Sequence, residues 1–364
     1  MSAQSQSAHA ATVSNLYYTS VAVVGQDAVE RRRGFRLALE SVLVKLTGDG
    51  AVATLPQLAN LMRNAQVHVA QYRYVALPGV DESKTNQAQA QQADEGSESG
   101  SASVTISEPT HILEVNFAQS SLNRALNEIG LPLWGAERPE TLLWLAVQET
   151  GRRYILSGGA TNAVRDALNE VAEKRALPIL LPLMDLQDQG TVNFTDVHGG
   201  FSGRVQDASS RYGVDTVMTG SLRQAASGWT SSWVLYRNNT LYEWQGRGSN
   251  INDVIGVGME GLANQLASSF SIAVNYAESS ILRVRVDGID SLDDYARVLA
   301  YLSGLAVVEK VDVALVESEV SHFILSTLGG VADLRDAVTL NAVLQPSDAP
   351  VSTAQADLHF SLIP

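Results

Sequence analysis

The stretch TLLWLAV, Thr141–Val147, decides the fold class of this chain because it is almost continuously apolar. Such a run is typical of a strand that is covered on both faces. A helical pattern follows at 162–175, and PILLPLM, Pro178–Met184, predicts a second buried strand. A strand, a crossover helix and a strand in this order predict a parallel sheet. We therefore expect a central α/β module over residues 139–278.

The same module contains a predicted antiparallel edge hairpin with three of the five tryptophans of the chain. GWTSSWVLYRNNTLYEWQGR, Gly228–Arg247, has alternating apolar residues on both sides of Asn238-Asn239, a pair that tolerates turn conformations. A two-residue turn at this point pairs Trp233 with Trp244. One face would then hold Trp229, Trp233, Leu235, Tyr242 and Trp244. We expect this face to be either a wall of the core or an interaction surface.

Two further modules flank the central one. Residues 13–138 mix helical and strand patterns and predict an α+β module, which an acidic insert interrupts at 81–103. The composition of this insert predicts disorder. Residues 279–364 have the order β-α-β-β-α-β, which predicts a ferredoxin-like module. A length of 364 residues agrees with a multi-domain chain of α/β and α+β modules.

The composition argues against several classes of function. The net charge of −14 opposes binding to a phosphate backbone, so we expect no nucleic-acid partner. The chain has no cysteine, which removes disulfides, thiolate nucleophiles and cysteine zinc sites. No apolar run reaches the roughly 18 residues of a membrane-spanning helix, so we expect no transmembrane segment.

The first residues predict export. Ala8-His9-Ala10 is an A-x-A sequence of the type that signal peptidase cuts after, although the charged and apolar regions that should precede it are missing. We interpret residues 1–12 as a disordered tail or as the remnant of a signal peptide truncated from this numbering. The lack of cysteine fits an oxidising compartment. We therefore expect a periplasmic location.

One glycine pattern could suggest a cofactor. Gly256-Val-Gly258-Met-Glu-Gly261 matches the dinucleotide pattern G-x-G-x-x-G. However, no full strand precedes it, and an apolar helical stripe runs through the glycines. This context favours close packing of a helix, and we predict no cofactor.

A polar loop after the second predicted strand is a candidate site. It contains Asp185, Asp188, Asp196 and His198. Ligands often bind at the carboxyl ends of parallel strands, whereas the alternative interpretation is a solvated surface loop. No pair of histidines has metal-ligand spacing, and no G-x-S-x-G motif is present, so the sequence predicts neither a metal site nor a catalytic residue.

Six segments carry a family resemblance: RLALESVLVKLTG at Arg36–Gly48, QYRY at Gln71–Tyr74, GLPLWGAERPETLLWLAV at Gly130–Val147, ILLPLMD at Ile179–Asp185, RYGVDTVMTGSL at Arg211–Leu222 and GWTSSWVL at Gly228–Leu235. Together they resemble an uncharacterised proteobacterial envelope family, domain of unknown function 2066 (DUF2066). Members of that family look like exported proteins with a signal peptide. The resemblance implies no catalytic residue.

These observations favour a non-catalytic, exported interaction or adaptor module that binds another envelope or inner-membrane protein. The alternative is a periplasmic solute- or glycan-binding protein, which requires Trp229, Trp233 and Trp244 to line a concave pocket. A third interpretation, an unrecognised hydrolase, requires the side chains of Asp185, Asp188, Asp196 and His198 to converge.

Overall fold

The computed structural model describes residues 10–77, 108–200, 202–237, 240–270, 279–305, 307–317, 319–339, 343–347 and 356–363. The chain forms two compact units, one made of residues 17–43 and 53–125 and the other of residues 1–16, 44–52 and 126–364. Each is a mixture of helices and sheets, as expected for a multi-domain α/β chain. The predicted insert at 81–103, residues 1–9 and the turn Asn238-Asn239 lie outside the described residues.

The central sheet has the strand order β11-β10-β9-β6-β7, with the short strand β8 paired to β6. Strand β6 pairs in parallel with β8 and β9, whereas the other neighbours are antiparallel. The predicted parallel pairing and the antiparallel edge hairpin are therefore confirmed. The strands are β6 (Thr141–Glu149), β7 (Arg152–Ile155), β8 (Ile179–Leu180), β9 (Thr216–Ala225), β10 (Gly228–Arg237) and β11 (Thr240–Gly248).

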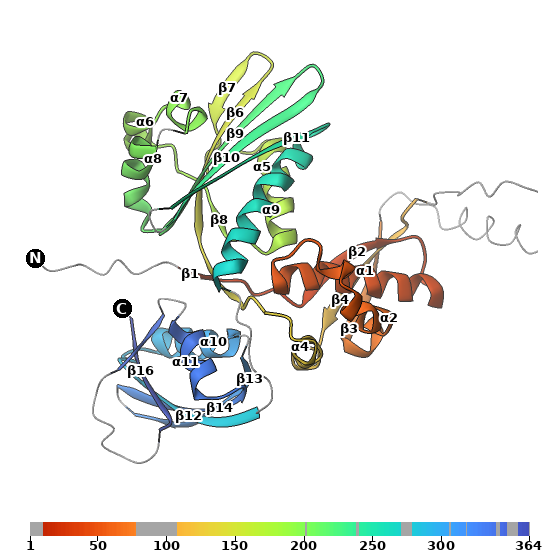
Figure 1. Ribbon diagram of the computed structural model, residues 1–364, viewed down its shortest axis with the longest axis vertical. Helices are drawn as coiled ribbons and strands as arrows, with labels where there is room; N and C mark the ends of the chain where they lie inside the picture. Colours follow the sequence, from red (N-terminus) through yellow and green to blue (C-terminus); the bar gives the residue numbers. More distant parts are fainter. Residues whose placement is uncertain are drawn as a thin grey trace, which may run out of the picture. The chain divides into compact units, whose positions relative to one another are not determined.

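Helices cover both faces of this sheet (Figure 1). Helices α5 (Ala163–Arg175) and α9 (Ile251–Phe270) lie on one face, and α6 (Leu186–Thr191), α7 (Phe194–His198) and α8 (Ser202–Ser209) lie on the other, followed by the 3-10 helix η4 (Ser210–Tyr212). All seven residues of Thr141–Val147 are buried, as predicted. Their side chains alternate between the two layers: Leu143, Leu145 and Val147 join one core cluster, while Leu142, Trp144 and Ala146 join the other.

The second buried strand predicted at Pro178–Met184 is wrong over most of its length. Ile179 and Leu180 pair with β6, and the ladder stops there. Pro182 has no amide hydrogen to donate to a ladder. Met184 has φ 56, which is incompatible with an extended strand. The stretch therefore leaves the sheet and leads into α6.

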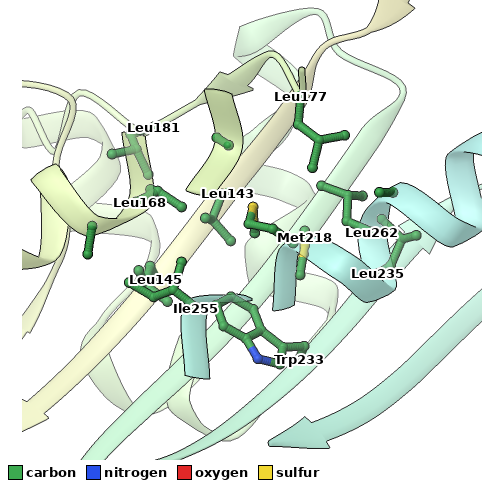
Figure 2. Packing of buried hydrophobic residues seen from close by; sticks show 14 of the residues in the cluster. Leu143, Leu145, Leu168, Leu177, Leu181, Met218, Trp233, Leu235, Ile255 and Leu262 are labelled. Atoms are coloured by element: carbon green, nitrogen blue, oxygen red, sulfur yellow. The ribbon is translucent and has the colours of Figure 1, made fainter. Parts of the chain in front are cut away.

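Helix α9 packs onto the hairpin through its glycines. A Cβ atom built on Gly258 would lie 2.3 Å from Cε2 of Trp233, and one built on Gly261 would lie 2.3 Å from Cε2 of Trp244. Both distances are far below van der Waals contact, so the helix can approach the indoles this closely because these residues are glycines. Figure 2 shows the Trp233 indole beside Ile255 in this core. The interpretation of the glycine pattern as helix packing is confirmed.

The C-terminal sheet has the order β13-β14-β12-β16-β15. Its elements are β12 (Ser279–Asp287), α10 (Leu292–Gly304), β13 (Val308–Val316), β14 (Val320–Leu328), α11 (Val331–Thr339), β15 (Leu344–Pro346) and β16 (Leu358–Leu362). Strand β16 runs parallel to β12, whereas the last strand of a ferredoxin-like unit runs antiparallel to the first. The short strand β15, which ends in a proline and was not predicted, pairs with β16 on its other side. The predicted four-stranded ferredoxin-like sheet is therefore not confirmed.

The smaller unit contains a three-stranded antiparallel sheet of order β2-β4-β3. Every second residue of β4 is buried, which fits one covered and one open face. Its strands and the N-terminal helices are β2 (Tyr18–Val23), α1 (Ala28–Thr47), η1 (Val52–Thr54), η2 (Pro56–Leu58), α2 (Ala59–Arg63), η3 (Ala65–His68), β3 (Val69–Ala76), β4 (His111–Phe117) and α4 (Gln119–Glu128). Outside this sheet, Ala10–Thr12 in the predicted tail form β1, which pairs with β5 (Glu137–Pro139).

Candidate functional site

A cleft of about 570 Å³ lies on the central module, over β9, β10 and β11. It is at the end of α7 and on the sheet face that α9 does not cover. Apart from Gly246 and from Ser231, whose buried hydroxyl donates to Val254 in α9, its lining residues contribute polar side chains. The lining consists of His198, Ser221, Arg223, Thr230, Ser231, Ser232, Gln245, Gly246 and Arg247. This composition suits a polar ligand better than an apolar one.

The register of the three strands arranges the lining in two rows. Thr230 on β10 lies opposite Arg223 on β9 and opposite Arg247 on β11. Two residues further along, Ser232 lies between Ser221 and Gln245 in the same way. Because successive side chains of a strand point to opposite faces, Thr230 and Ser232 face the cleft while Trp233 faces α9. One face of the hairpin therefore packs in the core, and the other face lines the cleft.

The first row concentrates positive charge. Arg223 and Arg247 are exposed, and neither forms an ion pair within the described part of the chain. Two strand spacings of about 4.8 Å separate their backbones, so the two flexible side chains can converge on a group above Thr230. The row continues through Gln148 on β6 to Arg153 on β7. Glu243, on the same face of β11, lies outside the lining.

His198 closes one end of the cleft. Its Nδ1 lies 2.6 Å from Oγ of Ser221, and its ring stacks on Phe194 with 5.3 Å between centroids and an interplanar angle of 16°. These two contacts fix the orientation of the imidazole. A serine–histidine contact is also part of a catalytic triad, but no described carboxylate contacts this ring to orient it as a base. The geometry therefore supports binding and gives no support to nucleophilic catalysis.

Asp185 and Asp188 of the predicted loop site are used to hold the loop itself. Asp185 caps α6 by accepting hydrogen bonds from the amides of Gln187 and Asp188. Arg211 donates to both Asp185 oxygens at 2.8 and 2.9 Å and lowers the pKa of that carboxyl to about 2. The buried Asp188 carboxylate accepts from the Tyr212 hydroxyl at 2.5 Å. Burial, together with this bond, raises the pKa of Tyr212 to about 12.

Asp196 has a similar structural role in the next helix. It forms a capping box with Asn193 at the start of α7, and Arg204 lies 3.4 Å from its Oδ2. Arg211 thus bonds both Asp185 and Asp188, whereas Asp196 pairs with Arg204, so the convergence of all four side chains that a hydrolase requires is not observed. Across the described residues, no group of three or more His, Cys, Asp or Glu side chains is placed to hold a metal ion. His198 alone of the four residues lines the cleft.

The tryptophan face is a wall of the core. Trp233 and Leu235 are completely buried, and Trp229 and Trp244 are partly buried against the same cluster. Trp244 Nε1 donates to the carbonyl oxygen of Val257 in α9 at 3.1 Å. Tyr242 is the exposed member, at 37%. The predicted interaction surface is therefore closed to a partner over most of its residues, and the predicted pocket lined by three tryptophans is wrong.

Except for His198, the residues that line the cleft were not predicted from the sequence. A signal for four of the nine was present, because Thr230, Ser232, Gln245 and Arg247 alternate with the tryptophans in the two strands of the hairpin. The antiparallel register of β10 and β11 places Thr230 opposite Arg247 and Ser232 opposite Gln245. The contributions of β9 and α7 come from tertiary pairing, for which the sequence gives no register.

A family model described as "Domain of unknown function (DUF8605)" matches residues 10–135. The resemblance to DUF2066 is therefore wrong, because the family that matches is a different one. None of the curated proteins matches the chain.

Two solved structures match weakly. The crystal structure of TolB from Acinetobacter baumannii is 13% identical, with 41% of this chain and 33% of that chain covered and a TM-score of 0.23. The match thus spans about a third of the TolB chain. The crystal structure of the competence-damaged protein (CinA) superfamily protein from Enterobacter cloacae is 10% identical, with coverage of 48% and 97% and a TM-score of 0.21. At these TM-scores neither similarity supports an inference about fold or function.

The helices give no sign of membrane insertion. Within the described ranges, none of them combines the length and the hydropathy that crossing a bilayer requires.

Proposed function

We propose that this chain is a non-catalytic binding protein whose central module holds a polar solute in the cleft over β9, β10 and β11. The observation that supports this most strongly is the cleft itself, about 570 Å³ in volume and lined by polar side chains from three strands and α7. Its volume falls within the range of small-molecule sites in proteins, about 300–1,000 Å³. A rigid sheet that is packed on its other face is suited to hold such donors in fixed positions.

A cleft-filling variant tests this proposal. Ser232 lies in the middle of the cleft floor and is exposed, so Ser232→Trp is expected to fill the cleft while the fold is kept. Ser227→Trp, in the exposed turn between β9 and β10, is the matched control. Thermal unfolding is measured with a panel of sugars, sugar phosphates, amino acids and muropeptides. The proposal predicts a compound that stabilises the wild type and S227W but does not stabilise S232W.

Two results would overturn the solute-binding proposal. One is a panel in which no compound changes the melting temperature at concentrations up to about 10 mM, well above the usual range of metabolite affinities. The other is a set of ligands that stabilise S232W as much as the wild type, because these must bind elsewhere.

A second candidate is the adaptor function for an envelope or inner-membrane protein. Strand β11 is an edge strand of nine residues, and it exposes Leu241 at 56% and Tyr242 at 37%. Such edges accept partner strands, and exposed aromatic side chains anchor interfaces. Photo-crosslinking from position 242 in cells, with position 227 as the control, should give one discrete adduct. The adaptor function requires that the purified partner then bind the wild type and fail to bind Leu241→Asp.

Export and the C-terminal topology are further proposals. The A-x-A sequence at Ala8-His9-Ala10 and the lack of cysteine support a periplasmic location, which fractionation of cells expressing the protein would test.

We also propose that the C-terminal module is a variant of the split βαβ unit with β16 inserted between β12 and β15. An experimental structure in which β12 and β15 are direct neighbours would contradict this arrangement.

A further inference from the structure

The cleft of the central module carries a charge pattern that narrows the class of its ligand. This inference rests on the proposed solute-binding function and adds the chemistry of the solute. The relevant residues are Arg223, Thr230 and Arg247, which form one row across β9, β10 and β11. In a chain with a net charge of −14, this row brings two guanidinium groups together without a described carboxylate partner. Unpaired arginines that face each other repel, so the row gains stability from a bound anion.

We propose that the cleft binds a phosphate monoester of a polyhydroxylated compound, with the phosphate held between Arg223 and Arg247 above Thr230. A phosphate monoester carries close to two negative charges at neutral pH, which two guanidinium groups neutralise. Its three terminal oxygens accept hydrogen bonds from both guanidinium forks and from a hydroxyl. A single carboxylate has one charge and two oxygens, and therefore matches this set of donors less well.

The second row fits the organic part of such a ligand. Ser221, Ser232 and Gln245 lie side by side, one residue pair along the strands from the arginines and facing the same cleft. Hydroxyl and amide groups both donate and accept hydrogen bonds, as the hydroxyls of a sugar require. His198 adds a ring nitrogen at the end of this row, fixed by Ser221 and Phe194.

The lining also disfavours two other phosphate-bearing ligands. The cleft has no aromatic side chain other than the imidazole of His198, whose ring already stacks on Phe194. Its two arginines would be engaged by the phosphate, so a nucleobase would lack a stacking partner. The lining has no aliphatic side chain to receive an acyl chain of a phospholipid. A soluble sugar phosphate therefore fits the cleft better than a nucleotide or a lipid headgroup.

Titration calorimetry with glucose 6-phosphate tests the inference on the whole chain. The expected result is saturable binding that weakens with added salt, because exposed ionic contacts are screened. Arg223→Gln and Arg247→Gln should each weaken binding about tenfold or more, since each removes a charge-assisted contact. Arg152→Gln is the matched control, because Arg152 is an exposed arginine on β7 whose pairing with Glu149 puts it on the opposite sheet face. It should leave the affinity unchanged.

Further titrations separate the sources of the phosphate group. Ser232→Ala should weaken glucose 6-phosphate binding and leave the binding of inorganic phosphate unchanged, because Ser232 lies in the hydroxyl row. Binding of phosphatidylglycerol vesicles without binding of glucose 6-phosphate would overturn the inference. So would glucose binding as tightly as its phosphate, or an unchanged affinity in both arginine variants.

The outcome also distinguishes this inference from the proposed function. If glucose 6-phosphate and inorganic phosphate fail to bind at about 10 mM, the inference is wrong. If a neutral solute raises the melting temperature of the wild type but not that of Ser232→Trp, the solute-binding function stands without the phosphate inference. The unliganded melting temperatures of the arginine variants should not fall below that of the wild type, because both side chains are exposed and each substitution relieves their mutual repulsion.

Discussion

Gly258 of α9 lies directly over the indole of Trp233 on β10, so close that a Cβ atom at this position would come within 2.3 Å of Cε2. Trp233 is fully buried, and the contact is part of the main core of the central module. Gly256, two residues earlier in the same helix, has no atom within 4 Å of its ideal Cβ position. Gly258 is therefore packed tightly against the sheet, whereas Gly256 of the same helix has open space at its Cβ position.

Alanine substitutions at these two glycines should change stability in opposite directions. Gly258→Ala is expected to destabilise the protein by about 1–3 kcal/mol, because the added methyl group overpacks the core against Trp233. Gly256→Ala is expected to stabilise it by up to about 1 kcal/mol, because alanine is the better helix former and the site is open. Urea denaturation measures both. Equal effects would show that α9 does not depend on this close approach.

Acrylamide quenching should report the two classes of hairpin tryptophan. Trp233 is shielded completely, whereas Trp229 and Trp244 are partly buried. Replacing Trp229 by Phe should therefore lower the mean quenching constant of the remaining fluorescence, and Trp233→Phe should raise it. The reverse order would mean that this face of the hairpin is open to solvent.

Arg138 is expected to be essential for stability because its buried guanidinium group donates hydrogen bonds to backbone carbonyl groups. Its side chain is fully buried, lies 3.9 Å from the Trp134 ring, and donates to the carbonyl oxygens of Arg175 and Ala176 at the end of α5. Arg138→Met would leave these carbonyl groups without the donor, at a cost of about 3 kcal/mol. Arg152→Met, at an exposed arginine, should change the free energy of unfolding by less than about 0.5 kcal/mol.

The ion pair between Asp185 and Arg211 predicts a pH dependence of stability. The pKa of Asp185 is lowered from 3.8 to about 2 in the folded state, chiefly by the hydrogen bonds from Arg211. The ionised carboxylate therefore stabilises the fold above about pH 4, and this contribution is lost as the pH falls towards about 2. Asp185→Asn keeps an oxygen to cap α6 but removes the charge. The stability difference between wild type and D185N should shrink over this pH range, and a constant difference would contradict the assignment.

Removal of the Tyr212 hydroxyl tests whether its hydrogen bonds to Leu183 and Asp188 stabilise the loop that leads into α6. This hydroxyl donates to the buried Asp188 carboxylate and accepts from the amide of Leu183 at 2.9 Å. Tyr212→Phe should destabilise the protein by about 1–3 kcal/mol, because the buried Asp188 carboxylate loses one of its donors and the Leu183 amide loses its acceptor. The carboxylate keeps its bonds from Met184 and Arg211. Tyr242→Phe, at an exposed tyrosine, is the control and should have little effect. Equal effects in urea denaturation would show that the Asp188 contact contributes nothing.

The fold was predictable where local patterns were strong. The apolar run at Thr141–Val147 and the alternating hairpin identified the centre of the sheet and the correct register between β10 and β11. Pro178–Met184 failed because its composition resembles a buried strand while its prolines prevent a ladder. In the C-terminal module, the parallel pairing of β16 with β12 is a long-range choice that no local pattern encodes.

The candidate site was predictable only in part. The loop residues Asp185, Asp188 and Asp196 attract attention as a group of acids, but helix capping and arginine pairing account for all three. Arg223 looks unremarkable in the sequence because the chain separates it from Arg247 by 24 residues. Antiparallel pairing of two consecutive hairpins brings both to one row. Sites on open sheet faces are hidden in this way whenever their residues come from several strands.

Strand β10 contributes to the core with one face and to the cleft with the other, and this limits which sequence changes the strand can accept. Odd-numbered residues such as Trp233 are tied to α9, whereas even-numbered residues such as Thr230 and Ser232 face the cleft. Point substitutions at Thr230 and Ser232 can therefore diversify ligand preference while the scaffold is preserved. A single-residue insertion or deletion within the strand would exchange the two sets and expel the tryptophan from the core. Natural variation and engineered libraries should accordingly tolerate replacements here and reject changes in length.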